Sequence, residues 1–153
     1  QYKGMFESGK VQIAAVPEPW ASQLVKEAGA KIIVDSSEIS FGESLPNTIL
    51  VTNSKFINED NEVIGQIVDA HKEAVDFINA NPKEAKQITI DSIKEITKQE
   101  LDAEVIDMAW EKIRYTTEVN QEVIQEFANS SFDLKFLKEQ PDFASLIDTQ
   151  FID

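Results

Sequence analysis

The chain has 153 residues, of which 42% are apolar, and it carries 14 basic against 28 acidic side chains, a net charge of −14. This length and composition fit one globular domain or part of a larger one. The acidic excess repels nucleic acid and anionic lipid, the absence of cysteine excludes disulfides and thiolate metal sites, and no apolar run approaches the ~20 residues that cross a bilayer. The only arginine is Arg114, so no guanidinium cluster can clamp an anion.

The first 53 residues predict alternating helices and strands. In chain order we expect a helix end at 1–9, a strand at 11–16, a helix at about 18–28 closed by Gly29, a strand at 31–35, a loop at 36–47 and a strand at 48–52. The first two strands are rich in β-branched residues and barely alternate, which is typical of strands covered on both faces. This part therefore predicts an α/β fold whose sheet is completed either by residues outside this chain or by a second copy.

From Ser54 onward the pattern is helical almost to the end. In 61–80 the apolar residues recur at steps of three and four. Asn81-Pro82 should stop that helix, because the residue before a proline is pushed out of helical geometry, and Pro82 can open the next one. We expect further helices at 82–93, at 98–113 and, capped by Thr116 or Thr117, at 119–128.

A series of short motifs follows these elements in a fixed order. They are Gly9 at a helix end, Ala14 and Ala15 in a strand that runs into Glu18-Pro19-Trp20, Pro46 before the third strand, Phe56-Ile57, and Asn81-Pro82 after a long helix. In order and spacing they resemble the back half of ABC-transporter solute-binding proteins of the nitrate, sulfonate and taurine type. Such proteins are much longer, so the resemblance implies that their front half would precede Gln1.

The resemblance implies a two-lobed, periplasmic-binding-protein-like fold of type II. Residues 1–45 would finish the second lobe, 46–53 would be the returning hinge strand, and the helix-rich part 54–153 would pack on the first lobe. The implied function is that of the extracytoplasmic component, periplasmic or lipid-anchored, of an ABC importer. It would capture a sulfonate, taurine, nitrate or a pyrimidine precursor of thiamine between its lobes, without a cofactor, and deliver this small-molecule solute to the permease.

The predicted ligand-binding residues are Pro17, Glu18, Pro19, Trp20 and Asn47. Trp20 follows a predicted strand end, where open α/β sheets bind ligands, and it would line the cleft or pack against the corner at Gly29. Glu18 could accept a hydrogen bond from a ligand, but stabilising the helix N-terminus is the favoured interpretation. The two prolines shape the turn.

Catalytic and metal-binding patterns are absent from the sequence. There is no nucleophile elbow and no phosphate loop, and the single histidine, His71, has no partner of metal-ligand spacing, so we predict neither an enzyme nor a metal site. Two alternatives stay open. One is a biosynthetic enzyme on the same two-lobed fold, related to pyrimidine synthases or to menaquinone-pathway enzymes; the other is an acidic helical module, at 54–140, for a basic partner. An unpaired sheet edge would also favour self-association.

Overall fold

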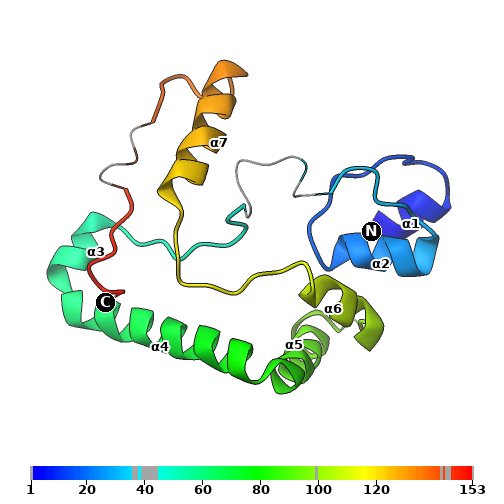
Figure 1. Cartoon of the computed structure of the whole chain (residues 1–153), viewed down its shortest axis with the longest axis horizontal. Helices are drawn as coiled ribbons and strands as arrows, with labels where there is room; N and C mark the ends of the chain where they lie inside the picture. Colours follow the sequence, from blue (N-terminus) through cyan, green and yellow to red (C-terminus); the bar gives the residue numbers. More distant parts are fainter. Residues whose placement is uncertain are drawn as a thin grey trace. The chain divides into compact units, whose positions relative to one another are not determined.

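The computed structural model describes residues 2–35, 38, 45–98, 100–141, 143 and 146–152. These residues divide into two compact units, each made of two stretches of chain. The first unit comprises Gln1–Ile33 and Phe77–Tyr115, and the second comprises Val34–Asp76 and Thr116–Asp153. The helices of the described part, labelled in Figure 1, are α1 (Tyr2–Glu7), α2 (Trp20–Ala28), α3 (Ser54–Glu59), α4 (Asn61–Ala80), α5 (Pro82–Thr97), α6 (Ala103–Trp110) and α7 (Gln121–Asp133). None of them is long and apolar enough to span a membrane.

The three predicted strands do not form a sheet among the residues that the structure describes, so the α/β class is not confirmed. Most of their apolar side chains face solvent instead, with Ile13 75%, Ile33 71% and Val51 75% exposed. A strand is stabilised only by hydrogen bonds to a neighbour in register, and these segments have no such neighbour here. Of the loop predicted at 36–47, residues 36, 37 and 39–44 lie outside the described part.

The predicted boundaries of α2 and α4 are confirmed where proline and glycine set them. Gly29 ends α2 in the left-handed conformation, with φ of 66°. Asn81 separates α4 from α5, and Pro82 occupies the first turn of α5, where its missing N–H costs nothing. Local backbone chemistry is enough to predict these three boundaries.

The end of α5 and both ends of α6 and α7 differ from their predicted positions. α5 continues to Thr97 because Lys98 adopts the left-handed conformation, with φ of 58°, and its N–H bonds to the carbonyl of Lys94. α6 starts only after Asp102, whose carboxylate accepts a hydrogen bond from the N–H of Glu104. The cap of α7 is Asn120 instead of Thr116 or Thr117, because the Asn120 Oδ1 accepts from the N–H of Val123 at 3.2 Å.

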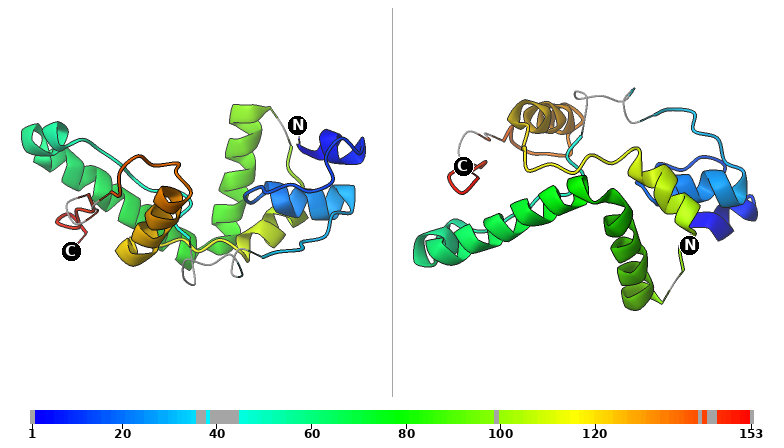
Figure 2. Two further views of the ribbon diagram at one scale, coloured as in Figure 1. Left: turned by 90° about the horizontal axis from the view of Figure 1, so that it is seen from above. Right: turned by 60° about the horizontal axis from the view of Figure 1, so that its bottom comes forward.

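The first unit is organised around the pairing of α2 with α6, which lie side by side in Figure 2. Two further helices join this pair, since α1 contacts α2 and α5 contacts α6. The buried apolar side chains of the unit come mainly from α6 and its approach, and they are Leu24, Ala85, Leu101, Val105, Ile106 and Ala109. A short helix of eight residues thus supplies half of these buried side chains.

The second unit holds α3, most of α4, and α7. Its buried apolar side chains are Ile64, Val75, Val123 and Ala128. Near the end of the chain, the Lys72 Nζ donates to the carbonyl oxygen of Ile152 at 2.8 Å. The chain crosses between the units after Ile33, within α4 after Asp76, and after Tyr115. The assignment of 1–45, 46–53 and 54–153 to lobes stays a prediction.

Candidate functional site

Four of the predicted ligand-binding residues, Pro17 to Trp20, form one turn that leads into α2. The carbonyl oxygen of Pro17 accepts hydrogen bonds from the N–H groups of Trp20 and Ala21, at 3.0 and 3.2 Å. Pro19 occupies the N-cap position, and the Glu18–Pro19 peptide bond is cis. The turn therefore brings these residues together at the start of a helix, as the sequence predicts.

Glu18 uses both of its carboxylate oxygens within the protein. Its Oε2 accepts a hydrogen bond from the backbone N–H of Ser22 at 3.0 Å, which satisfies one of the unpaired donors at the N-terminus of α2. Its Oε1 accepts from the Lys112 Nζ at 2.9 Å. The side chain is only 12% exposed. The predicted role of Glu18 at the helix N-terminus is confirmed by the first contact, whereas a role with ligand stays a prediction.

Lys112 contacts this turn, and the sequence did not predict that contact. It lies 94 positions after Glu18, just beyond the end of α6, and its side chain is 32% exposed. The sequence predicts an amphipathic helix that ends near here, but no local pattern predicts which helix it packs against. The antiparallel pairing of α2 with α6 is what brings the ammonium group to the Glu18 carboxylate.

A second set of ion pairs joins the other ends of the same two helices. The Lys26 Nζ lies 2.8 Å from an oxygen of Asp102 and 2.6 Å from an oxygen of Glu104. The hydrogen bonds to Asp102 and then Glu104 raise the pKa of Lys26. The pKa of Asp102 is lowered mainly by the hydrogen bond from Lys26 and, to a lesser extent, by the hydrogen bond from the backbone N–H of Glu104. Ion pairs at both ends thus fix the register of α2 on α6.

Trp20 lies at the first position of α2 and is half-buried. Its ring centroid is 6.4 Å from that of Tyr2, with the two planes inclined by 51°. This tilted geometry is one that aromatic pairs favour. Tyr2 is itself 49% exposed, so the pair presents aromatic surface to solvent beside the Pro17–Trp20 turn.

A second aromatic cluster in the first unit surrounds Trp110. Its ring centroid lies 4.8 Å from that of Tyr115, and the Lys86 Nζ lies 5.9 Å above the Trp110 ring. Lys86 also pairs with Asp107 at 2.7 Å. Burial raises the pKa of Tyr115. Trp110 is half-buried within this cluster.

Asn47, the fifth predicted ligand-binding residue, belongs to the second unit. It is exposed in a segment without helix or strand. Its ligand role stays a prediction.

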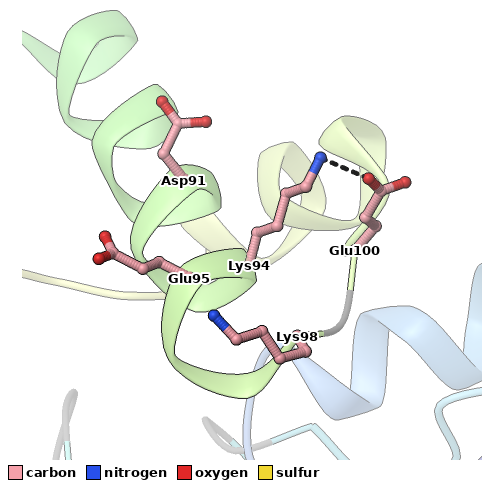
Figure 3. A pocket seen from close by; sticks show the side chains of 5 residues that line it. All are labelled: Asp91, Lys94, Glu95, Lys98 and Glu100. Carbon is pink, nitrogen blue, oxygen red and sulfur yellow. Dashed lines mark ion pairs between the residues drawn. The ribbon is translucent and has the colours of Figure 1, made fainter.

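An open hollow of the first unit lies at the C-terminal end of α5 and is shown in Figure 3. Its lining side chains are Asp91, Lys94, Glu95, Lys98 and Glu100. Lys94 points toward Glu100, with Nζ and Oε1 2.5 Å apart. This hydrogen bond raises the pKa of Lys94 and lowers that of Glu100. None of the predicted ligand-binding residues lines this open, internally paired hollow, so we do not assign it to the solute.

Within the described part of the chain, no group of three or more histidine or carboxylate side chains is placed to hold a metal ion. The acidic run at 58–62 spans the end of α3 and the start of α4. Its Asp60 ends α3 by donating its N–H to the carbonyl oxygen of Phe56.

Comparison with known proteins identifies one family. The model of the NMT1-like family matches residues 1–93, which include α1 to α4, most of α5 and the turn at Pro17–Trp20. No curated protein sequence and no solved structure matches the chain. The family implies a periplasmic-binding-protein-like fold, and its members are generally extracytoplasmic binding proteins rather than enzymes. Because the match spans 93 of the 153 residues, the chain belongs to the NMT1-like family.

Proposed function

We propose that this protein is part of the solute-binding component of an ABC importer and that it captures a small organic solute between two lobes. The observation that carries the proposal is the family match over residues 1–93, since the NMT1-like family supports a solute-binding role at the level of the family. The proposed solutes are a sulfonate, taurine, nitrate or a pyrimidine precursor of thiamine. The proposed setting is extracytoplasmic, as a periplasmic or lipid-anchored protein that delivers its solute to a permease.

The proposed ligand contact of this chain is Trp20. The ring is half-buried and stands at a helix start, on a turn that Pro17 and Pro19 shape and that Glu18 joins to Lys112. A half-buried aromatic ring suits recognition, because stacking on it orders few side-chain torsions. Asn47 is proposed as a second contact, placed before the segment that would form the returning strand.

The charges near Trp20 bear on the kind of solute. Lys112 is a cation that contacts this turn, and it is already paired with Glu18 at 2.9 Å. An anionic solute would therefore be held mainly by backbone N–H groups or by residues beyond this chain, since no guanidinium cluster is available.

Lobe closure is the proposed mechanism. Residues 1–45 would belong to one lobe, the segment 46–53 would be the hinge strand, and residues 54–153 would pack on the other lobe. The exposed apolar side chains of 48–51 support this assignment, because they are positions that a neighbouring strand would cover. A solute that contacts both lobes favours the closed state by its extra contacts there.

The two tryptophans of the chain allow a direct test. With Trp110→Phe, Trp20 becomes the sole indole reporter. We expect the emission of Trp20 to change on titration with the solute that binds. Trp20→Ala should weaken binding by roughly 30-fold, the loss of ~2 kcal/mol that an aromatic anchor supplies. Trp110→Ala, in the same unit, is the matched control and should leave the affinity within about threefold. Equal losses in the two alanine variants would rule out the proposed contact.

A further inference from the structure

Helix α4 carries two apolar faces within the second unit. One face contributes Ile64 and Val75 to the buried core. The other contains Val63, Ile67, Ala70 and Ala74, whose steps of four, three and four place them on one side of a helix. All four are exposed, with Val63 at 40% and Ile67 at 43%. We call these four residues the apolar stripe.

A row of carboxylates runs along the apolar stripe, on the side away from the buried face. It consists of Glu62, Asp69, Glu73 and Asp76. The first three each directly precede a residue of the apolar stripe, and Asp76 directly precedes Phe77, the next position of the same helical repeat. All four are exposed, and none forms an ion pair with a residue that the structure describes. We call these residues the acidic row.

We propose that this face of α4 is an interaction surface for another protein that presents apolar side chains beside a row of lysines or arginines. The apolar stripe supplies area that burial would stabilise, and aliphatic side chains of a partner helix can fill the spaces left by the two alanines. The acidic row then selects the partner by charge, because a basic row alongside would pair with it while an acidic one would be repelled.

The distribution of charge favours a basic partner over a second copy of this chain. Of the 28 acidic residues, 17 fall in the second unit, together with four of the 14 basic ones, so this unit carries −13 of the net charge of −14. Two copies meeting through α4 would place two acidic rows and two strongly negative units together. Such like charges are repulsive, whereas the same field speeds the approach of a cationic face.

This surface is independent of the proposed solute site, since no residue of the Pro17–Trp20 turn belongs to it. Its test therefore does not depend on whether a solute binds. The probe is a fluorescently labelled amphipathic helical peptide of the length of α4, with a leucine stripe beside a lysine row. A second peptide carries glutamate in place of the lysines, and a third keeps the lysines but replaces the leucines with serine. Fluorescence anisotropy measures binding to the protein.

We expect the first peptide to bind, with an affinity that falls as salt screens the charges. The peptide with glutamates should not bind measurably, and the peptide without leucines should bind more weakly than the first. Equal binding of the first and third peptides would overturn the role of the apolar stripe. Failure of the first peptide to bind, or concentration-dependent dimerisation of the protein abolished by Ile67→Ser, would overturn the proposal as a whole.

Matched variants separate this surface from general attraction to an acidic protein. One variant neutralises the acidic row by Glu62→Gln, Asp69→Asn, Glu73→Gln and Asp76→Asn. The control makes the same change in net charge elsewhere in the second unit, by Glu122→Gln, Glu126→Gln, Asp133→Asn and Glu139→Gln. Neutralising the row should weaken binding of the first peptide by roughly tenfold, the loss expected for several exposed ion pairs. An equal loss in the control, with both variants folded by circular dichroism, would show attraction to net charge alone and contradict the proposal.

Discussion

Removing the Glu18 side chain tests how the turn before α2 is held. Glu18→Ala deletes both the acceptor for the Ser22 N–H and the partner of Lys112. Loss of a helix N-terminal acceptor costs about 0.5–2 kcal/mol, and loss of a partly exposed ion pair adds about 0.2–1 kcal/mol. The free energy of unfolding of the first unit should therefore fall by about 1–3 kcal/mol.

Glu18→Gln separates the two contacts, because a glutamine oxygen can still accept from the Ser22 N–H. This variant should lose only the ion pair, about 0.2–1 kcal/mol. Lys112→Met should cost a similar amount, and the double variant of Glu18→Gln with Lys112→Met should cost less than the two single losses added together. A zero coupling energy in this cycle would mean that the ion pair contributes no stability.

Urea unfolding followed by tryptophan emission is the assay, since Trp20 and Trp110 both lie in the first unit. Glu95→Gln is the control, because Glu95 is an exposed carboxylate of the same unit that contacts neither Glu18 nor Ser22. Its midpoint should match that of the unmodified protein. If Glu18→Ala proved as stable as this control, Glu18 would not stabilise the N-terminus of α2.

Three further predictions concern the core, the helix ends and the response to pH. Leu24→Ala should destabilise the first unit by about 2–5 kcal/mol in the same urea assay, whereas Ile96→Ala, at an 81% exposed position, should stay within about 0.5 kcal/mol; equal effects would contradict the packing of α2. Asn120→Ala should cost about 1 kcal/mol and reduce the helical circular dichroism signal on heating, and an unchanged melting curve would argue against Asn120 as the cap of α7. Lys26 lowers the pKa of Asp102. The stability that this pair contributes is therefore present above pH 3.8, the ordinary pKa of aspartate, and is lost as the pH falls through the lower pKa of Asp102 in the folded protein. The same pair raises the pKa of Lys26. The stability that the pair contributes is therefore present below pH 10.5, the ordinary pKa of lysine, and is lost as the pH rises through the higher pKa of Lys26 in the folded protein. Lys26→Met should flatten melting temperature against pH at both extremes, and an unchanged profile would contradict the pairing.

Helix ends were predictable from sequence where one residue decides the backbone conformation. Gly29 can adopt positive φ without a steric penalty, and Pro82 both fixes its own φ and restricts Asn81. The end of α5 was not predictable in this way, because Lys98 adopts positive φ without being glycine. The start of α7 was ambiguous because several polar residues near Asn120 can accept a cap hydrogen bond.

Pairings between distant segments were not predictable. A β-branched run such as 11–16 indicates a strand only if a neighbour completes its hydrogen bonds, and here its Ile13 is exposed instead. The contact of Lys112 with Glu18 was not predictable for the same reason, because it depends on how α6 packs on α2. The local role of Glu18 was predictable, because a carboxylate just before a helix favours its N-terminus whatever else surrounds it.

Solute binding can be tested directly by a thermal-shift screen of the protein against sulfonates, taurine, nitrate and pyrimidines. A ligand that binds the folded state stabilises it by RT ln(1 + [L]/Kd), about 2.7 kcal/mol at ~100 times Kd. We expect one of these solute classes to raise the melting temperature in a concentration-dependent manner, and we expect Trp20→Ala to shift the curve to higher concentrations. A melting temperature that stays constant with every class up to millimolar concentration would contradict the proposed solute binding.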